Sequence, residues 1–226
     1  MTAPISLMIF AAGFGKRMGV LTKDTPKPML LLNGKPLIDH AIAFGQQVSS
    51  TPIVANTHYL HDKIAPHLAA QNIRTFHETP DILDTGGGLL AARDHLTSPT
   101  MTLNPDYAWI GPNPLQYLQN EWRDDMQALL LLIDPAKAHN REGPGDFALA
   151  DGKLTRGGPM IYPGAQIIRT NRLHEIGQSK FSLNAYWDLL AESTGIHGTV
   201  YPGEWCDIGN PEGLAMAEAL TGAAHV

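Results

Sequence analysis

The segment Ile5-Ser6-Leu7-Met8-Ile9-Phe10-Ala11-Ala12-Gly13-Phe14-Gly15-Lys16-Arg17 joins an apolar run to two closely spaced glycines and two basic residues. Residues 5–10 are few, apolar and followed by small residues, which is typical of a buried strand. Ligands of open α/β sheets bind beyond the carboxyl ends of the strands, so residues 13–17 occupy a binding position. Glycines let backbone amides approach a phosphate, and the basic pair adds positive charge. The segment predicts an α/β sheet with an anion-binding loop after its first strand.

Two well-known phosphate motifs are excluded at this loop. A Walker A loop requires Gly-Lys followed by Ser or Thr, and no such triplet is present here. The dinucleotide fingerprint requires a glycine where Met18 stands. The loop is therefore a different phosphate-binding turn or an ordinary glycine turn between a strand and a helix.

Short apolar runs alternate with helical patterns up to residue 133. This alternation indicates right-handed βαβ units and a doubly wound, mostly parallel, Rossmann-like sheet. The expected strands are 5–10, 30–32, 53–55, 73–77, 101–103 and 128–133, and the expected helices are 37–48, 61–69, 88–96 and 115–122.

The alternation of single strands with helices ends after residue 133. Residues 147–150 and 153–155 flank Asp151-Gly152, which predicts a hairpin with a type I′ turn. Further strands are expected at 160–162, 165–169, 199–201 and 205–206, and helices at 171–176, 182–192 and 211–220. We expect one domain over residues 1–226, with a nucleotide-type core in 1–133 and a small antiparallel lobe with a closing helix in 134–226.

Composition narrows the class of protein. Of the 226 residues, 43% are hydrophobic, enough for a full core, and 17% are charged. Sixteen basic residues stand against 22 acidic ones, and the net charge of −6 disfavours nucleic acid and membrane surfaces as partners. No apolar stretch is long enough to cross a membrane, no basic residue precedes the N-terminal apolar run, and Cys206 is the single cysteine. These features predict a cytoplasmic protein.

Positive charge is concentrated near the N-terminus. A quarter of the basic residues fall within twelve positions, namely Lys16, Arg17, Lys23 and Lys27. Lys27 is flanked by prolines, which predicts a stiff, extended segment, and an ordered lysine loses less entropy when it binds an anion. The cluster predicts a small, strongly anionic ligand, although Lys27 taken alone fits better with a surface lysine in a proline-rich loop.

Four separate elements within residues 11–38 resemble the N-terminal signature of the sugar-1-phosphate nucleotidylyltransferases. They are Ala11-Ala12-Gly13-Phe14-Gly15-Lys16-Arg17-Met18, Leu21-Thr22, Thr25-Pro26-Lys27-Pro28-Met29 and Asn33-Gly34-Lys35-Pro36-Leu37-Ile38. Val20 departs from the family pattern, which usually has proline there. The resemblance implies a fold of the nucleotide-diphospho-sugar transferase type, in which residues 134–226 form the sugar-binding lobe.

Three later segments extend the resemblance: Asp84-Thr85-Gly86-Gly87-Gly88-Leu89, Asp106 after the strand 101–103, and Asp207 within residues 203–211. Pro105 departs from the glycine that usually precedes the first of these aspartates. The resemblance implies nucleotide binding by Ala11, Ala12, Gly13, Gly15, Lys16, Arg17, Thr85, Gly86 and Gly87; catalysis by Arg17, Lys27 and Asp106; sugar-phosphate binding by Lys27, Asp146 and Gly164; and Mg²⁺ binding, with Mn²⁺ as a substitute, by Asp106 and Asp207.

The implied activity is transfer of a nucleotidyl group from an NTP to a sugar 1-phosphate, with release of pyrophosphate. The length and the 84–88 segment are similar to short N-acetylmuramate-1-phosphate uridylyltransferases of bacterial cell-wall recycling, which implies UTP and N-acetylmuramic acid 1-phosphate as substrates. The alternatives are a mannose-1-phosphate guanylyltransferase, a phosphocholine cytidylyltransferase-like enzyme, or a non-catalytic protein that binds sugar nucleotides. We expect a monomer or a small homo-oligomer.

The histidines His58, His61 and His77 leave a second reading open. Their clustering near two strand ends could supply a zinc site, but no cysteine or carboxylate motif accompanies them. We favour a position for Asn56 and His58 near a bound base or sugar.

Overall fold

The computed structural model describes residues 4–193 and 195–223. Within these residues nine strands form one sheet, in the order β10 (Phe147–Ala150), β11 (Lys153–Arg156), β13 (Ile196–Val200), β8 (Ala128–Leu132), β12 (Ala165–Ile168), β6 (Thr100–Leu103), β1 (Ser6–Phe10), β4 (Ile53–Thr57) and β5 (Arg74–His77). Strands β11 and β12 run antiparallel to their neighbours, and the other strands share one direction. The predicted α/β class with a mostly parallel sheet is confirmed.

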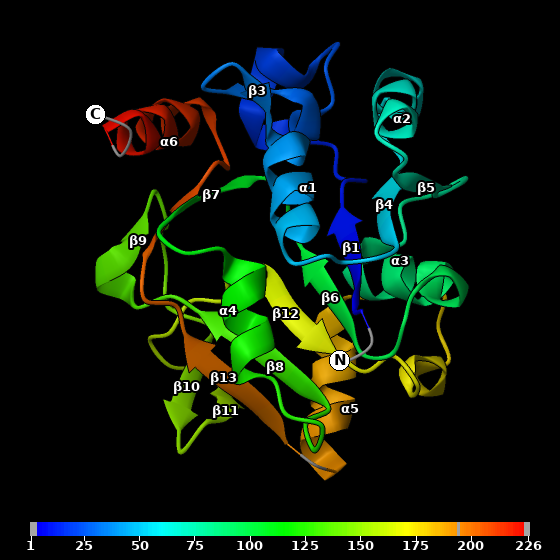
Figure 1. Cartoon of the computed structure of the whole chain (residues 1–226), viewed down its shortest axis with the longest axis vertical. Helices are drawn as coiled ribbons and strands as arrows, with labels where there is room; N and C mark the ends of the chain where they lie inside the picture. The colour runs from blue at the N-terminus through cyan, green and yellow to red at the C-terminus, as the bar shows by residue number, and fades with distance from the viewer. Residues whose placement is uncertain (1–3, 194, 224–226) are drawn as a thin grey trace.

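Helices cover both faces of this sheet (Figure 1). One face packs against α1 (Leu37–Gln47), α2 (His61–Ala70) and α4 (Pro114–Glu121), and the other against α3 (Asp84–Ala92) and α5 (Leu183–Ser193). The first strand shows why: Leu7 and Ile9 belong to the cluster of α1 and α4, whereas Met8 belongs to the cluster of α3 and α5. Successive side chains of a strand point to opposite faces, so a wholly apolar strand must be covered twice.

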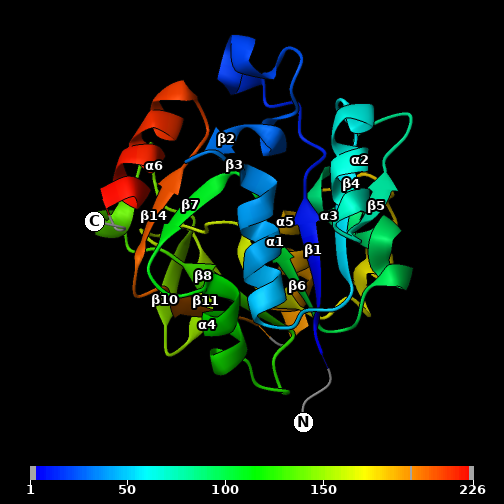
Figure 2. The same cartoon turned by 45° about the horizontal axis from the view of Figure 1, so that its top comes forward.

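Two smaller sheets lie beside the main one. Strands β7 (Tyr107–Ile110), β14 (Glu204–Asp207) and β9 (Ala138–His139) form the first, and β2 (Leu31–Leu32) and β3 (Lys35–Pro36) form the second. The closing helix α6 (Pro211–Ala223) packs through Ala217 on a third apolar cluster that includes Cys206 and Ile208 (Figure 2). The short 3₁₀ helices are η1 (Lys16–Thr22), η2 (Lys27–Met29), η3 (Arg93–His95), η4 (Pro135–Lys137) and η5 (Leu173–Ile176).

Several local predictions need correction. Strands β7 and β9 were not expected, because each is short and mixes polar with apolar residues. Residues 160–162 make only isolated bridges, and residues 173–176 form a 3₁₀ turn instead of an α-helix. Helix α3 begins at Asp84 and not at Gly88, so the three glycines lie inside its first turns.

The predicted division at residue 133 lies within the main sheet. Strand β12, from the second part of the chain, pairs with β6 on one side and β8 on the other. Both of these neighbours come from the first part. None of the helices in the described part of the chain is long and apolar enough to cross a membrane.

Candidate active site

The loop after β1 is fixed by a buried chain of hydrogen bonds. The Ala11 N–H donates to Asn56 Oδ1 at 2.9 Å, and Asn56 Nδ2 donates to Glu78 Oε1 at 2.7 Å. The second oxygen of Glu78 accepts the Leu83 N–H at 2.7 Å, and the Glu78 side chain is 1% exposed. A Cβ on Gly88 would lie 2.6 Å from Glu78 Oε1, so only glycine lets α3 pack here. This network joins the loop after β1, strand β4 and the loop after β5, and the sequence patterns did not reveal Glu78.

Replacement of Glu78 by alanine should destabilise the protein. The change leaves the Asn56 amide and the Leu83 N–H buried without an acceptor, and each unpaired buried group costs about 1–3 kcal/mol. Chemical denaturation should show the loss as a lower midpoint. Glu78→Gln retains one acceptor oxygen and should lose less; equal midpoints for the wild type and the alanine variant would contradict the network.

Lys27 is held against both the glycine loop and Asp106. Gly15 has φ of 63°, and a Cβ at this position would lie 2.9 Å from the Cβ of Lys27. The Lys27 Nζ lies 2.5 Å from Asp106 Oδ2. The residue begins the 3₁₀ turn η2 and is 8% exposed, so the expected extended conformation is wrong and the reading as a free surface lysine is excluded.

Asp106 and Asp207 come together although a hundred residues separate them in the sequence. Strand β14 pairs with β7 in a register that sets Asp207 opposite Tyr107, next to Asp106. The Ile208 N–H also donates to the Asp106 carbonyl at 3.1 Å. Antiparallel pairing of two short strands that flank the main sheet thus places both carboxylates at one edge.

Asp207 is an unusual carboxylate. Its side chain carries an oxygen, Oδ1, that is buried and has no hydrogen-bond partner among the described residues, while Oδ2 lies 3.7 Å from Arg17 Nη1. Burial raises the pKa of Asp207, the charge of Asp106 raises it further, and Arg17, Lys27 and Arg141 lower it. Two adjacent carboxylates with a bare buried oxygen form a hard oxygen donor set, which suits a divalent cation such as Mg²⁺.

Three neighbouring cavities open around these residues. A cavity of about 280 Å³ is lined by Gly13, Gly15, Lys16, Arg17, Lys27 and Asp106. A second, of about 240 Å³, is lined by Ala12, Gly13, Asn56, Thr85, Asn104 and Asp106. The third, of about 850 Å³, is lined by Arg17, Thr85, Asn104, Asp146 and Asp207 among others. Phe10 lines all three, so the cavities meet beyond the end of β1.

The remaining predicted residues divide into cavity walls and packing positions. Thr85 and Asp146 line the large cavity, and Asp146 Oδ2 accepts the Tyr162 N–H at 2.9 Å. Gly86 and Gly87 do not appear among the described lining residues of the three cavities: both amides donate to the Phe181 carbonyl at 3.0 Å. A Cβ on Gly87 would lie 2.3 Å from the Ser179 carbonyl oxygen, so the glycines let α3 approach the segment before α5.

Gly164 packs closely against Asn104, a residue of the cavity walls. Its φ is 78°, and a Cβ there would lie 2.7 Å from the Asn104 side chain. The Gly164 carbonyl accepts the Asn104 N–H at 3.0 Å. Gly164 therefore fixes Asn104, which lines two of the cavities.

Several wall residues of the large cavity were missed by the sequence patterns: Arg141, Arg156, Asn184, Trp187, Asp188 and Trp205. Trp187 was expected only in the core, yet it is both buried and part of this wall. The Nε1–H of Trp205 is buried and has no acceptor among the described residues. These side chains come from β9–β11, α5 and β14, where no glycine or lysine signature marks a binding site.

The histidines do not form a metal site in the described part of the chain, where no group of three or more His, Cys, Asp or Glu side chains is arranged to hold a metal ion. The rings of His61 and His77 stack with their centroids 3.8 Å apart. Burial and the neighbouring His77 lower the pKa of His61. Asn56 lines the 240 Å³ cavity, whereas His58 contacts the Glu78 carbonyl through Nδ1 at 2.8 Å.

An α/β sheet with a glycine loop, two basic residues and paired carboxylates at one edge defines a nucleotidyltransferase. The family model for the MobA-like NTP transferase domain matches residues 7–185, and the chain belongs to this family. Its activity is that of a sugar-1-phosphate nucleotidyltransferase.

Two relatives are similar over nearly their whole length. The N-acetylmuramate alpha-1-phosphate uridylyltransferase of Caulobacter vibrioides is 30% identical, with 96% of this chain and 97% of the relative covered. The protein of the same name from Neisseria meningitidis is also 30% identical, over 96% and 98% of the two chains.

Solved structures show the same fold. The inositol-1-phosphate CTP transferase from T. maritima superposes with a TM-score of 0.81 at 13% identity, covering 99% of this chain and 97% of the other. HddC from Yersinia pseudotuberculosis complexed with GMP-PN gives 0.76 at 21% identity, covering 95% and 98%.

Proposed function

We propose that the protein transfers a uridylyl group from UTP to N-acetylmuramic acid 1-phosphate. A phosphate oxygen of the sugar attacks the α-phosphorus of UTP, the bond to the β-phosphate breaks, and pyrophosphate leaves. The observation that carries the proposal is the meeting of Lys27, Asp106, Asp207 and Arg17 where the three cavities join. The choice of base and sugar rests on the full-length similarity to the two uridylyltransferases.

We assign the cation-lined cavity of about 280 Å³ to the triphosphate. Gly13 and Gly15 line the 280 Å³ cavity together with Lys16 and Arg17, so backbone amides and two cations face the same volume. Asn56 and Thr85 line the adjacent 240 Å³ cavity, which we assign to the nucleoside with Ala11 and Ala12 at its border. The 850 Å³ cavity, with Asp146 in its wall, is left for the sugar.

Asp106 and Asp207 would hold Mg²⁺, with Mn²⁺ as a substitute. The buried, unpaired Oδ1 of Asp207 fits a cation, and the contact of Asp106 with Lys27 shows that this edge already attracts positive charge. When bound, the ion neutralises phosphate charge and polarises the phosphoryl oxygens. The chain itself positions the reactants and supplies cations, which is the main requirement of phosphoryl transfer.

Arg17 and Lys27 have different roles in this proposal. The Arg17 guanidinium rests against Gly209, where an added Cβ would lie 2.4 Å from Nη1, and its side chain is largely exposed. It can therefore follow the departing pyrophosphate. Lys27 is buried and held by Asp106, and in this proposal it contacts the reacting phosphates.

Arg17→Ala and Lys27→Ala should change different kinetic parameters. Arg17→Ala should lower both kcat and the affinity for UTP, each by about tenfold, because the β- and γ-phosphates are charged before and after transfer. Lys27→Ala should lower mainly kcat, again by about tenfold, because the reacting phosphates gain charge in the transition state. Steady-state kinetics measure the effect on kcat, and binding of a non-hydrolysable UTP analogue measures the effect on affinity. Unchanged analogue affinity in Arg17→Ala would remove that residue from the triphosphate site.

The function is tested by pyrophosphate release with four NTPs against a panel of sugar 1-phosphates and phosphocholine. The proposal expects UTP with N-acetylmuramic acid 1-phosphate to give the highest kcat/KM. GTP with mannose 1-phosphate, or CTP with phosphocholine, would identify an alternative transferase. Binding of sugar nucleotides without turnover in any pair would indicate a non-catalytic protein.

A further inference from the structure

The wall of the 850 Å³ cavity holds arginines that the triphosphate cavity does not share. Arg141 and Arg156 line it, in addition to the Arg17 that it shares with the triphosphate cavity. The hydroxyls of a neutral sugar need hydrogen-bond partners but no second cluster of cations. Carboxylates also line this wall, namely those of Asp146, Asp188 and Asp207. A negatively charged group of the acceptor can therefore bind only where one of the two further arginines keeps donors free.

Arg156 is already satisfied by the protein. Its Nε and Nη2 donate to Asp188 Oδ1 at 3.0 and 2.9 Å, and its Nη1 donates to Asn184 Oδ1 at 2.8 Å. Nη2 also donates to the Asn184 carbonyl at 2.8 Å. The guanidinium lies over the rings of Phe147 and Trp187, with its carbon 5.2 and 5.3 Å from their centroids. Arg156 therefore joins β11 to α5 and shapes the wall.

Arg141 has few protein partners and faces the same cavity. Among the described residues its guanidinium contacts Asp146, with Nη2 3.4 Å from Oδ1, which is long for a charged hydrogen bond. Asp146 directs its other oxygen to the Tyr162 N–H. An arginine carries five N–H donors, so most of those on Arg141 are available to a ligand. Its side chain is 32% exposed, so the charge is partly shielded from solvent.

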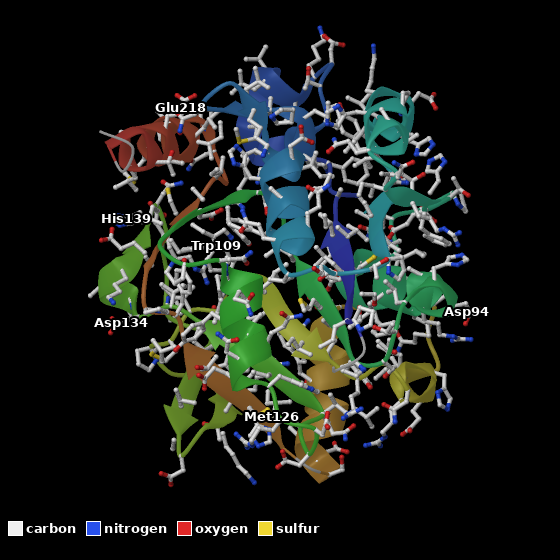
Figure 3. All side chains as sticks on the ribbon, in the orientation of Figure 1. Asp94, Trp109, Met126, Asp134, His139 and Glu218 are labelled. Atoms are coloured by element: carbon white, nitrogen blue, oxygen red, sulfur yellow. The ribbon has the colours of Figure 1, made fainter. Side chains whose placement is uncertain are left out.

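The backbone beside Arg141 is anchored to the catalytic edge. Asn140 Nδ2 donates to the Asp207 carbonyl at 2.7 Å and to Asn210 Oδ1 at 3.0 Å. His139 pairs with Glu204 at 2.7 Å, and Figure 3 shows His139 on the side of the molecule that carries Glu218 of α6. Arg141 is thus held at a set position relative to Asp207, as a specificity residue must be.

We propose that Arg141 binds a carboxylate on the sugar and so selects an acidic sugar 1-phosphate over its neutral counterpart. N-acetylmuramic acid differs from N-acetylglucosamine by a lactyl ether that ends in a carboxylate, and a guanidinium matches a carboxylate in a bidentate pair. This assignment rests on the proposed function and names the group that recognises its substrate. The phosphates already have Lys16, Arg17 and Lys27.

The test compares Arg141→Gln with the wild type on N-acetylmuramic acid 1-phosphate and N-acetylglucosamine 1-phosphate, with UTP saturating. Loss of a charged hydrogen bond corresponds to about 10- to 100-fold, so kcat/KM for the acidic sugar should fall by this factor, mainly through KM. Turnover of the neutral sugar should stay within about twofold. Arg141→Lys keeps the charge but not the planar fork and should lie between the two.

Arg172→Gln is the matched control, because Arg172 pairs with Glu175 outside the cavity and its loss changes the net charge equally. Equal losses on both sugars in Arg141→Gln would place the residue at the phosphate or in the scaffold and overturn the proposal. Unchanged selectivity between the acidic and the neutral sugar in Arg141→Gln would also overturn the proposal. A wild type that prefers a neutral sugar would instead refute the acceptor in the proposed function, before any variant is measured.

Discussion

Asp207→Ala should lower kcat by at least about 10²-fold and leave the fold intact. The variant loses one of two carboxylates that face the reacting phosphates, and removal of one charge-stabilising group at such a site costs about this factor. The residue sits at the end of β14 with an oxygen that has no partner in the described part of the chain, so its loss breaks one weak ion pair with Arg17. Turnover under saturating substrates and circular dichroism measure the two parts of the expectation.

Asp94→Ala is the control for the loss of an acidic side chain. Asp94 lies far from the site at the edge of the molecule in Figure 3, and its side chain is 83% exposed. Its variant should keep the wild-type rate. Near-normal turnover in Asp207→Ala would mean that the second metal ligand is another residue.

Removal of divalent metal should abolish turnover completely. Two carboxylates would face two phosphates, and without a cation the repulsion between them opposes both binding and attack. Activity should vanish in excess EDTA and return with Mg²⁺ or Mn²⁺. Titration of apo protein with Mn²⁺ in the presence of UTP supplies a readout that does not depend on turnover.

The Asp106→Asn, Asp207→Asn double variant is the comparison for that titration. It keeps both side chains close to their original size while it removes the charge, so Mn²⁺ should bind much more weakly. Full activity of the wild type in excess chelator would eliminate the metal from the proposal.

The sequence predicted those parts of the fold that local chemistry determines. The runs at 5–10, apolar except for Ser6, and 128–133, wholly apolar, became β1 and β8, since such runs are stable only when both faces are covered. Asp151-Gly152 formed the expected tight turn, with φ of 49° and 74°, because these residues tolerate the left-handed region. The glycine loop after β1 could be located for the same reason, because glycines and charges mark it in the chain itself.

The site also depends on pairings that no local pattern contains. The sequence predicted part of β14, at 205–206, but not β7, and it is the register of these two strands that brings Asp106 and Asp207 together. The glycine run at Gly86 and Gly87 predicts a close approach of the nucleotide, and the structure adds a packing role that the sequence did not indicate. The close neighbours of these glycines are Phe181 and Ser179, residues almost a hundred positions away. Long-range packing and ligand contact require the same small residue, so only the three-dimensional structure separates them.

The interleaving of β12 between β6 and β8 limits how such a protein can be re-engineered or can diverge. A chimera that exchanged residues 134–226 between two transferases would replace the strand that joins β6 to β8 with one from the other protein. Fully buried residues such as Met101 and Leu130 would then face a foreign neighbour. Acceptor choice therefore cannot be inherited as a detachable module. It must change residue by residue, in the loops and the face of α5 that surround the large cavity, while the sheet beneath them stays the same.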